Sequence, residues 1–333
     1  MLETLFQQSL DFTLFLQSIG DWLTPIMQAF TFLGNEEFYL LVMPILVWLV
    51  DYRFGARMGT LLLTTGAINW IGKAACHQPR PFWIDTGIKV LDPTPHTGFG
   101  VPSGHSMNSA AVFGLFATWI KRSWVTVLAV FIFLMVGISR IYLGVHFTVD
   151  VVVGWTLGLL ILWLFIKFED KVASWFKSKS AAAQIGTAFV ITIGLTLIGA
   201  GVRFLVLANG FELLPIWIEN AMHHQPDTPL DPLNLDGLIT NTGALFGLAC
   251  GVVWINGSGG FNAASGPWWK KIVRFVVGLI GVVLFWQVLG SVLPDTPDLV
   301  GYSLRYMRYA LVGFWMAGLG PWLFIKLGIG EKK

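Results

Sequence analysis

Charged side chains are scarce in this chain: Asp, Glu, Lys and Arg make up 12% of its 333 residues. A soluble domain carries about 25% charged residues, so the deficit excludes an ordinary soluble fold. The net charge is only +2, which gives no reason to expect a nucleic-acid partner. Hydrophobic residues make up 55% of the chain. The composition therefore predicts an integral membrane protein with one helical domain.

Cysteine is scarcer still: Cys76 and Cys250 are the two in the chain. Two cysteines form neither a disulfide framework nor a zinc-binding pattern. The N-terminus carries Glu3 and no basic stretch, so we do not expect a cleaved signal peptide. We find no repeat with a period of 20–50 residues and no inverted repeat of the kind that transporters have.

Nine apolar segments are predicted to be membrane helices. They are residues 37–50, 56–75, 104–120, 124–141, 148–167, 184–207, 236–256, 272–293 and 307–328. Residues 5–32 mix apolar stretches with Gln and Asp, which favours a helix lying at the membrane interface. The predicted fold class is an all-α polytopic bundle. Its expected parts are an interfacial segment 1–36, core helices one to five in 37–168, and helices six to nine in 169–333.

Loop charge predicts the orientation of these helices. With the N-terminus outside, 14 of the 21 Lys and Arg residues face the cytoplasm, as the positive-inside rule requires. These are Arg53, Arg57, Lys121, Arg122, Lys167, Lys171, Lys177, Lys179, Lys270, Lys271, Arg274, Lys326, Lys332 and Lys333.

Three polar clusters interrupt the apolar sequence, each where a predicted span begins or ends. They read Lys73-x6-Arg80-Pro81, Pro102-Ser103-Gly104-His105 and Ser139-Arg140-x5-His146-x3-Asp150. Under the predicted orientation all three lie on the extracytoplasmic side. Ionisable groups at such positions are costly in free energy and are usually functional.

Together the clusters predict a phosphate-binding site. Lys73, Arg80 and Arg140 supply positive charge, and guanidinium groups suit bidentate contact with phosphate oxygens. Ser103 and Gly104 precede an apolar helix whose free N–H groups favour an anion. Taken alone, Lys73 and Arg80 could instead be basic residues that extend to the membrane surface.

Two histidines and one carboxylate complete the expected chemistry. His146 and Asp150 are four residues apart, so a helix beginning near His146 would place them on one face. A carboxylate on one ring nitrogen leaves the other free to attack phosphorus, so we expect His146 to be the nucleophile. His105 is the expected general acid. The alternative is that His105 caps its helix and that His146 and Asp150 form a structural pair. We expect no metal or cofactor, and assign no role to Lys89 or His96.

These motifs resemble those of the type 2 phosphatidic acid phosphatase (PAP2) superfamily, whose pattern is Lys-x6-Arg-Pro, Pro-Ser-Gly-His and Ser-Arg-x5-His-x3-Asp. Every motif position is filled, and the resemblance covers about residues 37–168. It implies a six-helix, haloperoxidase-like catalytic bundle and a phosphohistidine intermediate.

The C-terminal half narrows the resemblance to particular members of this superfamily. Residues 238–247 (Leu-Ile-Thr-Asn-Thr-Gly-Ala-Leu-Phe-Gly) are similar to a helix of glucose-6-phosphatase, and the nine-span layout is similar to that enzyme and to sphingosine-1-phosphate phosphatases. Asp150 favours the lipid-phosphatase pattern, because glucose-6-phosphatase departs from Asp at this position.

The expected function is therefore that of a membrane phosphatase in the plasma (inner) membrane. Its active site is expected to face the outside, the periplasm or a lumen. Its expected substrate is a lipid phosphate such as phosphatidic acid, a long-chain-base phosphate or an isoprenoid (pyro)phosphate. A sugar phosphate as substrate, phosphotransfer to an alcohol, and a lipid or phosphate transporter or inactive receptor stay open. The sequence predicts contact with membrane lipids but no oligomeric state.

Overall fold

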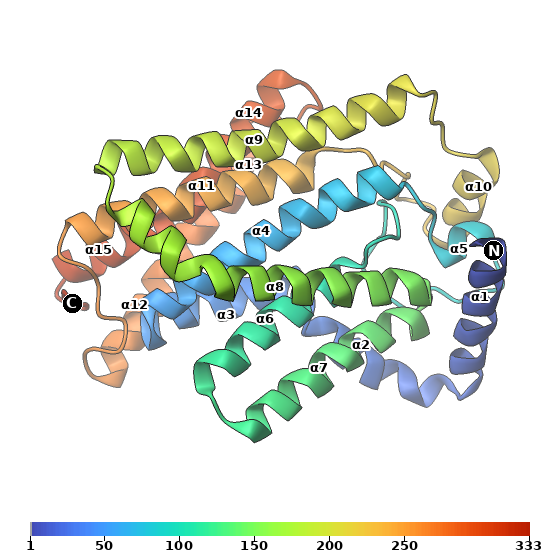
Figure 1. Cartoon of the computed structure of the whole chain (residues 1–333), viewed down its shortest axis with the longest axis horizontal. Coiled ribbons are helices and arrows are strands. Elements are labelled where there is room, and N and C mark those ends of the chain that lie inside the picture. The colour runs from blue at the N-terminus through green and yellow to red at the C-terminus, as the bar shows by residue number, and fades with distance from the viewer. Residues whose placement is uncertain (1) are drawn as a thin grey trace. The chain divides into compact units, whose positions relative to one another are not determined.

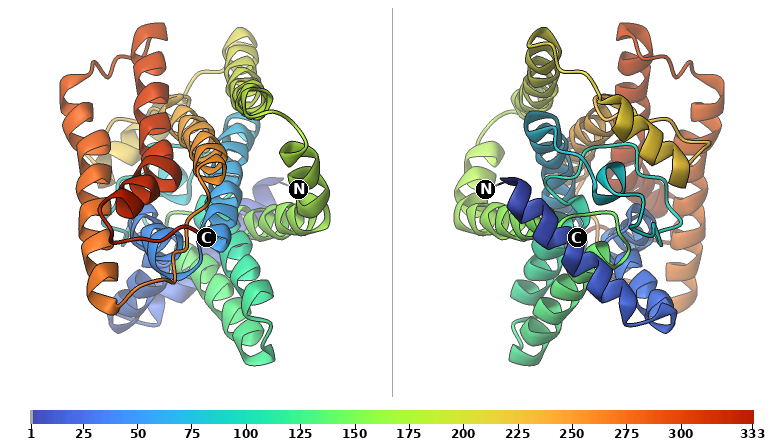
Figure 2. Two further views of the ribbon diagram at one scale, coloured as in Figure 1. Left: turned by 90° about the vertical axis from the view of Figure 1, so that its left-hand side faces the viewer. Right: turned by 90° about the vertical axis from the view of Figure 1, so that its right-hand side faces the viewer.

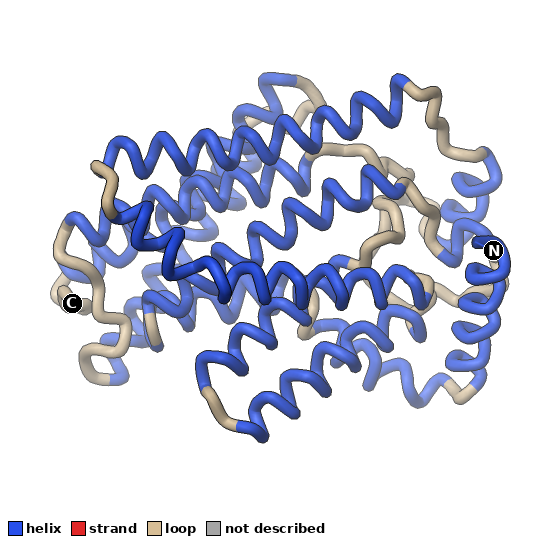
Figure 3. The backbone as a smooth tube through the Cα atoms, viewed as in Figure 1, coloured by secondary structure: helices blue, strands red, loops and turns tan. Residues whose placement is uncertain are grey.

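The computed structural model describes residues 2–333, and the regular elements in this part of the chain are all helices (Figures 1 and 3). The chain divides into two compact units, each assembled from segments that are distant in the sequence. The first unit comprises Met1–Phe38, Ile68–Trp163 and Gly199–Asn234, and the second comprises Tyr39–Ala67, Leu164–Ile198 and Leu235–Lys333. The predicted three-part division of the chain is not tested by these boundaries and stays a prediction.

The first unit holds all three polar clusters. Its own helices are α1 (Leu2–Ser18), α2 (Thr24–Phe32), α5 (Pro81–Ile84), α6 (Gly104–Ile120), α7 (Ser123–Tyr142) and α10 (Pro215–His224). It shares α3 (Glu36–Ile45), α4 (Tyr52–Cys76), α8 (Thr148–Lys177) and α9 (Ala181–Ala208) with the second unit.

Helices α6 and α7 form an antiparallel hairpin in the first unit, drawn in green in Figures 1 and 2. Ser103 caps α6, and Lys121 ends it in the left-handed conformation at φ 56°. Helix α2 packs on α7. An aromatic core that includes Phe82, Trp83 and Phe99 lies under the loop that follows α4, so this loop is anchored although it contains little regular structure.

The second unit contains the C-terminal helices. They are α11 (Asp236–Gly257), α12 (Trp268–Val283), α13 (Leu289–Val292), α14 (Leu299–Phe314) and α15 (Gly320–Lys326). Helices α11 and α14 pack closely because glycines line their contact. A Cβ atom on Gly247 would lie 1.8 Å from the carbonyl oxygen of Ala310, so no larger residue fits there.

π-Helical turns occur at Leu46–Val50, Leu284–Val288 and Trp315–Leu319. Two of them adjoin a proline inside a helical run: Pro44 precedes the first and Pro321 follows the last. Proline has no N–H to donate, and the backbone relieves this by a local change of helix type.

Five helical segments are long and apolar enough to cross a membrane: α7, α8, α9, α11 and the continuous run Trp268–Val292. A sixth arises if Asp21–Phe32 and Glu36–Val50, bent by 46°, form one broken span. This confirms a polytopic helical membrane protein but not the predicted count of nine. Each of the nine predicted segments does fall on a helical run, although α6, for example, has only 17 residues.

Candidate functional site

The histidine–carboxylate pair lies where α7 leads into α8. His146 Nδ1 is 3.0 Å from Asp150 Oδ2, and the backbone N–H of Phe147 donates to the same oxygen at 3.0 Å. A carboxylate only accepts hydrogen bonds, so Nδ1 carries the proton and Nε2 keeps its lone pair. His146 is 2% exposed and Asp150 is 0% exposed. The structure thus brings this predicted pair together and fixes the tautomer of the ring.

The second ring nitrogen of His146 accepts a hydrogen bond from a cation. Arg80 Nη1 donates to His146 Nε2 at 3.3 Å, so an anion that took this N–H in place of the ring would lie beside the lone pair. Burial, with the charges of Arg80 and Lys73, holds the pKa of His146 well below its usual range. The ring is therefore neutral at neutral pH, which is the state that a nucleophile needs.

Lys73 and Arg80 are held by backbone carbonyls of the loop between α4 and α6. Lys73 Nζ donates to the carbonyls of Phe99 and, at 3.1 Å, of Gly100. Arg80 donates through Nε to Gly98 at 2.6 Å and through Nη1 to Val145 at 2.8 Å. Burial and the charge of Arg140 lower the pKa of Arg80 to about 9, so it is still charged at neutral pH.

Arg140, at the end of α7, is fully buried in a polar cluster. Its Nη1 donates to Thr31 Oγ1 and lies 2.5 Å from Asp92 Oδ2, and its Nη2 lies 3.1 Å from His96 Nε2. Its Nε is buried without a hydrogen-bond partner among the described residues. Because Nη1 and Nη2 both have partners, Nε is the donor of this guanidinium that is left for a phosphate oxygen.

Asp92 and His96 also contact each other, with Asp92 Oδ2 3.0 Å from His96 Nε2. Burial alone would raise the pKa of Asp92, but the His96 hydrogen bond and the charge of Arg140 outweigh it and hold that pKa far below its usual range. Burial lowers the pKa of His96 to about 3 despite the carboxylate. At neutral pH the cluster therefore pairs an ionised Asp92 with Arg140 and contains a neutral His96.

The start of α6 carries the remaining predicted residues. Ser103 Oγ accepts from Ser106 N at 3.4 Å and from Ser106 Oγ at 3.0 Å, so this side chain caps the helix. The Ser103 N–H donates to the Asp150 carbonyl at 3.0 Å, which ties the cap to α8. Gly104 and His105 begin the helix, where backbone N–H groups have no intrahelical acceptor. His105 Nε2 lies 2.7 Å from Asn35 Oδ1.

Four residues near these groups were not assigned to the site from the sequence: Thr31, Asn35, Asp92 and His96. Thr31 and Asn35 belong to the segment that we expected to be interfacial, and His96 was left without a role. No spacing rule links them to the motifs, because Thr31 precedes its partner Arg140 by 109 residues and Asn35 precedes His105 by 70. Only the fold makes these pairs visible.

The arrangement suits an anion better than a cation. Three basic side chains face two carboxylates, which leaves one formal positive charge to be balanced by a ligand. Within the described residues, no group of three His, Cys, Asp or Glu side chains is placed to hold a metal ion. The charges and the free N–H groups match what a phosphoryl group needs as its charge spreads in the transition state.

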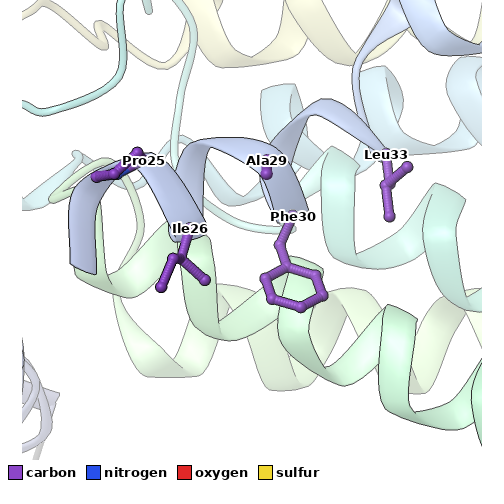
Figure 4. A pocket seen from close by; sticks show the side chains of 5 residues that line it. All are labelled: Pro25, Ile26, Ala29, Phe30 and Leu33. Atoms are coloured by element: carbon purple, nitrogen blue, oxygen red, sulfur yellow. The ribbon is translucent and has the colours of Figure 1, made fainter. Parts of the chain in front are cut away.

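An apolar hollow of about 400 Å³ lies elsewhere on the first unit, on α2 (Figure 4). It is lined by Pro25, Ile26, Ala29, Phe30 and Leu33. Helical spacing places these residues opposite the face of Met27 and Thr31, which are buried. The hollow is therefore separate from the polar site and has no group that could take part in its chemistry.

Comparison with known proteins gives a consistent result over most of the chain. The model described as "PAP2 superfamily" matches residues 54–174, and "PAP2 superfamily phosphatase, transmembrane extension" matches residues 239–332. The chain is 34% identical over 162 residues to phosphatidylglycerophosphatase B of Bacillus subtilis, covering 45% of this chain and 77% of that protein.

Two further relatives match along nearly the whole chain. Sphingosine-1-phosphate phosphatase 1 of Mus musculus is 23% identical, with 90% of this chain and 71% of that protein covered. Glucose-6-phosphatase 3 of Bos taurus is 26% identical, with 92% of each covered.

Proposed function

Because the chain belongs to the PAP2 superfamily and is a multi-pass membrane phosphatase, we propose that His146 is its nucleophile and His105 its general acid. The observation that carries this proposal is the geometry of His146. Asp150 fixes the proton on Nδ1, and Nε2 accepts a hydrogen bond from Arg80 Nη1 at 3.3 Å. A phosphate bound by Arg80 would present its phosphorus to the lone pair.

The reaction then has two steps. The Nε2 lone pair of His146 attacks phosphorus, and the bond from phosphorus to the ester oxygen breaks while His105 gives its proton to the departing alcohol. Water next attacks the phosphohistidine, His105 takes up a proton from that water, and the bond between nitrogen and phosphorus breaks. Lys73, Arg80 and Arg140 balance the phosphoryl charge in both steps.

We propose a lipid phosphate as the substrate, with the site on the extracytoplasmic side of the membrane. The site residues lie at the ends of apolar helices: Lys73 in the last turn of α4, Arg140 in the last turn of α7 and Asp150 in the first turn of α8. A headgroup could reach this level while its tail stays in the bilayer. Two relatives reported above are named for lipid phosphates, which supports this choice.

A sugar phosphate is the second candidate. The glucose-6-phosphatase relative matches 92% of both chains, so the similarity extends through the C-terminal helices. A phosphatase for a soluble substrate would need a route to water and no contact with an acyl chain.

The test is phosphate release by purified protein in detergent, with EDTA present. The substrates are phosphatidic acid, phosphatidylglycerophosphate, sphingosine-1-phosphate, undecaprenyl diphosphate and glucose-6-phosphate. We expect one lipid to be preferred and expect His146→Ala to lower that rate on the order of 10³-fold or more. His223→Ala, at an exposed histidine of α10, is the matched control and should keep wild-type activity.

Each result has a distinct meaning. A preference for glucose-6-phosphate would replace the lipid as substrate and leave the mechanism in place. Substantial activity in His146→Ala would remove His146 as the nucleophile. Loss of all activity in EDTA, restored by a divalent cation, would contradict the expectation that the basic side chains alone balance the phosphoryl charge.

A further inference from the structure

The turn between α2 and α3 contacts the histidine that starts α6. We propose that Asn35 is a positioning residue for His105: it holds the Nε2–H of the ring, so that Nδ1 delivers the proton to the departing alcohol. This inference rests on the proposed role of His105 as general acid. It goes beyond that role by naming the nitrogen that acts and the residue that selects it.

The hydrogen bond defines the tautomer. Asn35 Oδ1 can only accept, and it lies 2.7 Å from His105 Nε2, so Nε2 carries hydrogen. In the neutral ring Nδ1 then has the lone pair, and in the imidazolium ion the Nδ1 proton is the one left to transfer.

Packing fixes the same ring from a second direction. A Cβ atom on Gly34 would lie 2.9 Å from His105 Cδ2 and 2.9 Å from Val136 Cγ1. Only glycine allows the backbone to approach the ring this closely. The His105 ring is therefore bounded by the backbone of Gly34 and hydrogen-bonded by the next residue, which leaves little rotational freedom.

The backbone N–H groups of this turn have their own acceptors, so the Asn35 side chain is available to contact His105. The backbone N–H of Gly34 donates to Thr31 at 2.9 Å, and that of Asn35 donates to Phe32 at 3.0 Å. The turn falls at the 46° bend between the segments Asp21–Phe32 and Glu36–Val50. The same short segment also supplies Thr31 to Arg140. One bend thus contacts both the acid and a phosphate-binding cation.

The location of His105 is consistent with proton transfer in this site. It lies within electrostatic reach of Arg140, His96, Asp92 and Arg80. Two of these, Arg140 and Arg80, are proposed to hold the phosphoryl group. A ring that rotated freely beside this group could present either nitrogen, and in half of its orientations Nδ1 would not face the departing alcohol.

The experiment compares leaving groups in Asn35→Leu and Asn35→Asp. An alkyl phosphate needs its alcohol to be protonated, whereas p-nitrophenyl phosphate does not. We expect Asn35→Leu to slow the alkyl substrate about 10- to 100-fold and the aryl substrate less than about threefold. Asn35→Asp keeps an acceptor for Nε2–H and should restore the alkyl rate. Should Asn35→Leu not fold, Asn35→Ala is measured in the same way.

Two further variants separate the possible explanations. Gln28→Leu breaks a different hydrogen bond of α2, from Gln28 Nε2 to the Leu91 carbonyl at 2.9 Å, and should leave the ratio of alkyl to aryl rates unchanged. His105→Ala combined with Asn35→Leu should be no slower on the alkyl substrate than His105→Ala alone.

Equal losses on both substrates in Asn35→Leu, or no rescue by Asn35→Asp, would overturn the positioning role while the acid role of His105 stands. If His105→Ala itself slowed both substrates equally, the acid role would fail, and the inference with it.

Discussion

At the scale of single residues, the buried ion pair between Arg140 and Asp92 has the clearest consequence for stability. The two side chains are 0% and 8% exposed, and their closest atoms lie 2.5 Å apart. Removing one partner of a buried pair leaves an unbalanced charge and costs about 3–5 kcal/mol. We therefore expect Asp92→Asn to lower the free energy of unfolding by about this amount and to raise KM more than it lowers kcat. Thermal unfolding in detergent and steady-state kinetics measure the two effects.

The matched control for this variant is Asp85→Asn in the same loop. Asp85 accepts a hydrogen bond from the Gly87 N–H at 2.8 Å, which an asparagine can replace. We expect a change within about 0.5 kcal/mol. Equal destabilisation by both variants would mean that the loop, rather than the ion pair, is sensitive to the substitution.

Two buried histidines predict how stability depends on pH. Burial, with nearby positive charge, holds the pKa of His146 well below its usual range, and burial lowers that of His96 to about 3. Below pH 6.5 the unfolded chain binds a proton at each ring that the folded chain does not, so stability falls as the pH falls. The loss is at most about 1.4 kcal/mol per pH unit for each histidine.

Melting temperatures in detergent between pH 7.5 and 5 measure this dependence. His96→Gln should flatten the decrease by removing the contribution of this ring, whereas His223→Gln, at an exposed position, should leave it unchanged. If the melting temperature of His96→Gln fell on acidification as steeply as that of the wild type, His96 would already be protonated in the folded protein.

At the scale of elements, glycines on α8 set its distance from α6. A Cβ atom on Gly158 would lie 2.3 Å from the Met107 carbonyl oxygen, and one on Gly154 would lie 2.6 Å from that of Ser103. Backbone atoms cannot move aside as a flexible side chain can, so Gly158→Ala must displace one helix. We expect a cost of about 1–3 kcal/mol in stability and a fall in kcat of about tenfold, because α6 begins at the site and α8 carries Asp150.

Gly201→Ala in α9 is the control, because no heavy atom lies within 4 Å of the added Cβ. Alanine forms helices more readily than glycine by about 1 kcal/mol, so this variant should be neutral or slightly stabilising. Equal kcat losses in both variants would remove helix spacing as the cause.

The motif residues could be predicted from the sequence because their spacing is local. His146 and Asp150 are four residues apart, so one turn of chain brings them together. The supporting contacts could not be predicted in this way. Asp92 meets Arg140 across 48 residues and Asn35 meets His105 across 70, and a polar residue in a loop or near a helix end is ordinary on its own. The bend at residues 33–35 was not predicted either, so the contacts of Thr31 and Asn35 with the site were not expected.

At the scale of the whole molecule, the predicted orientation can be tested with the native cysteines. Cys76 is exposed at the end of α4, and Cys250 is half-buried within α11. If the polar clusters face outward, a membrane-impermeant maleimide should label intact cells expressing the protein, and Cys76→Ser should abolish that labelling. Cys250→Ser should leave it unchanged. Labelling that requires permeabilised cells would reverse the predicted orientation.

Lys73 and Arg80 are anchored by the carbonyls of Phe99, Gly100, Gly98 and Val145. An anchoring carboxylate would cancel the field of a buried cation, whereas a carbonyl dipole steadies it and leaves most of that field intact. In surroundings of low dielectric constant the remaining field reaches further than it would in water. A phosphate at the membrane edge would therefore be attracted before it makes contact, and raising the salt concentration should slow its capture much more than it slows the chemical steps.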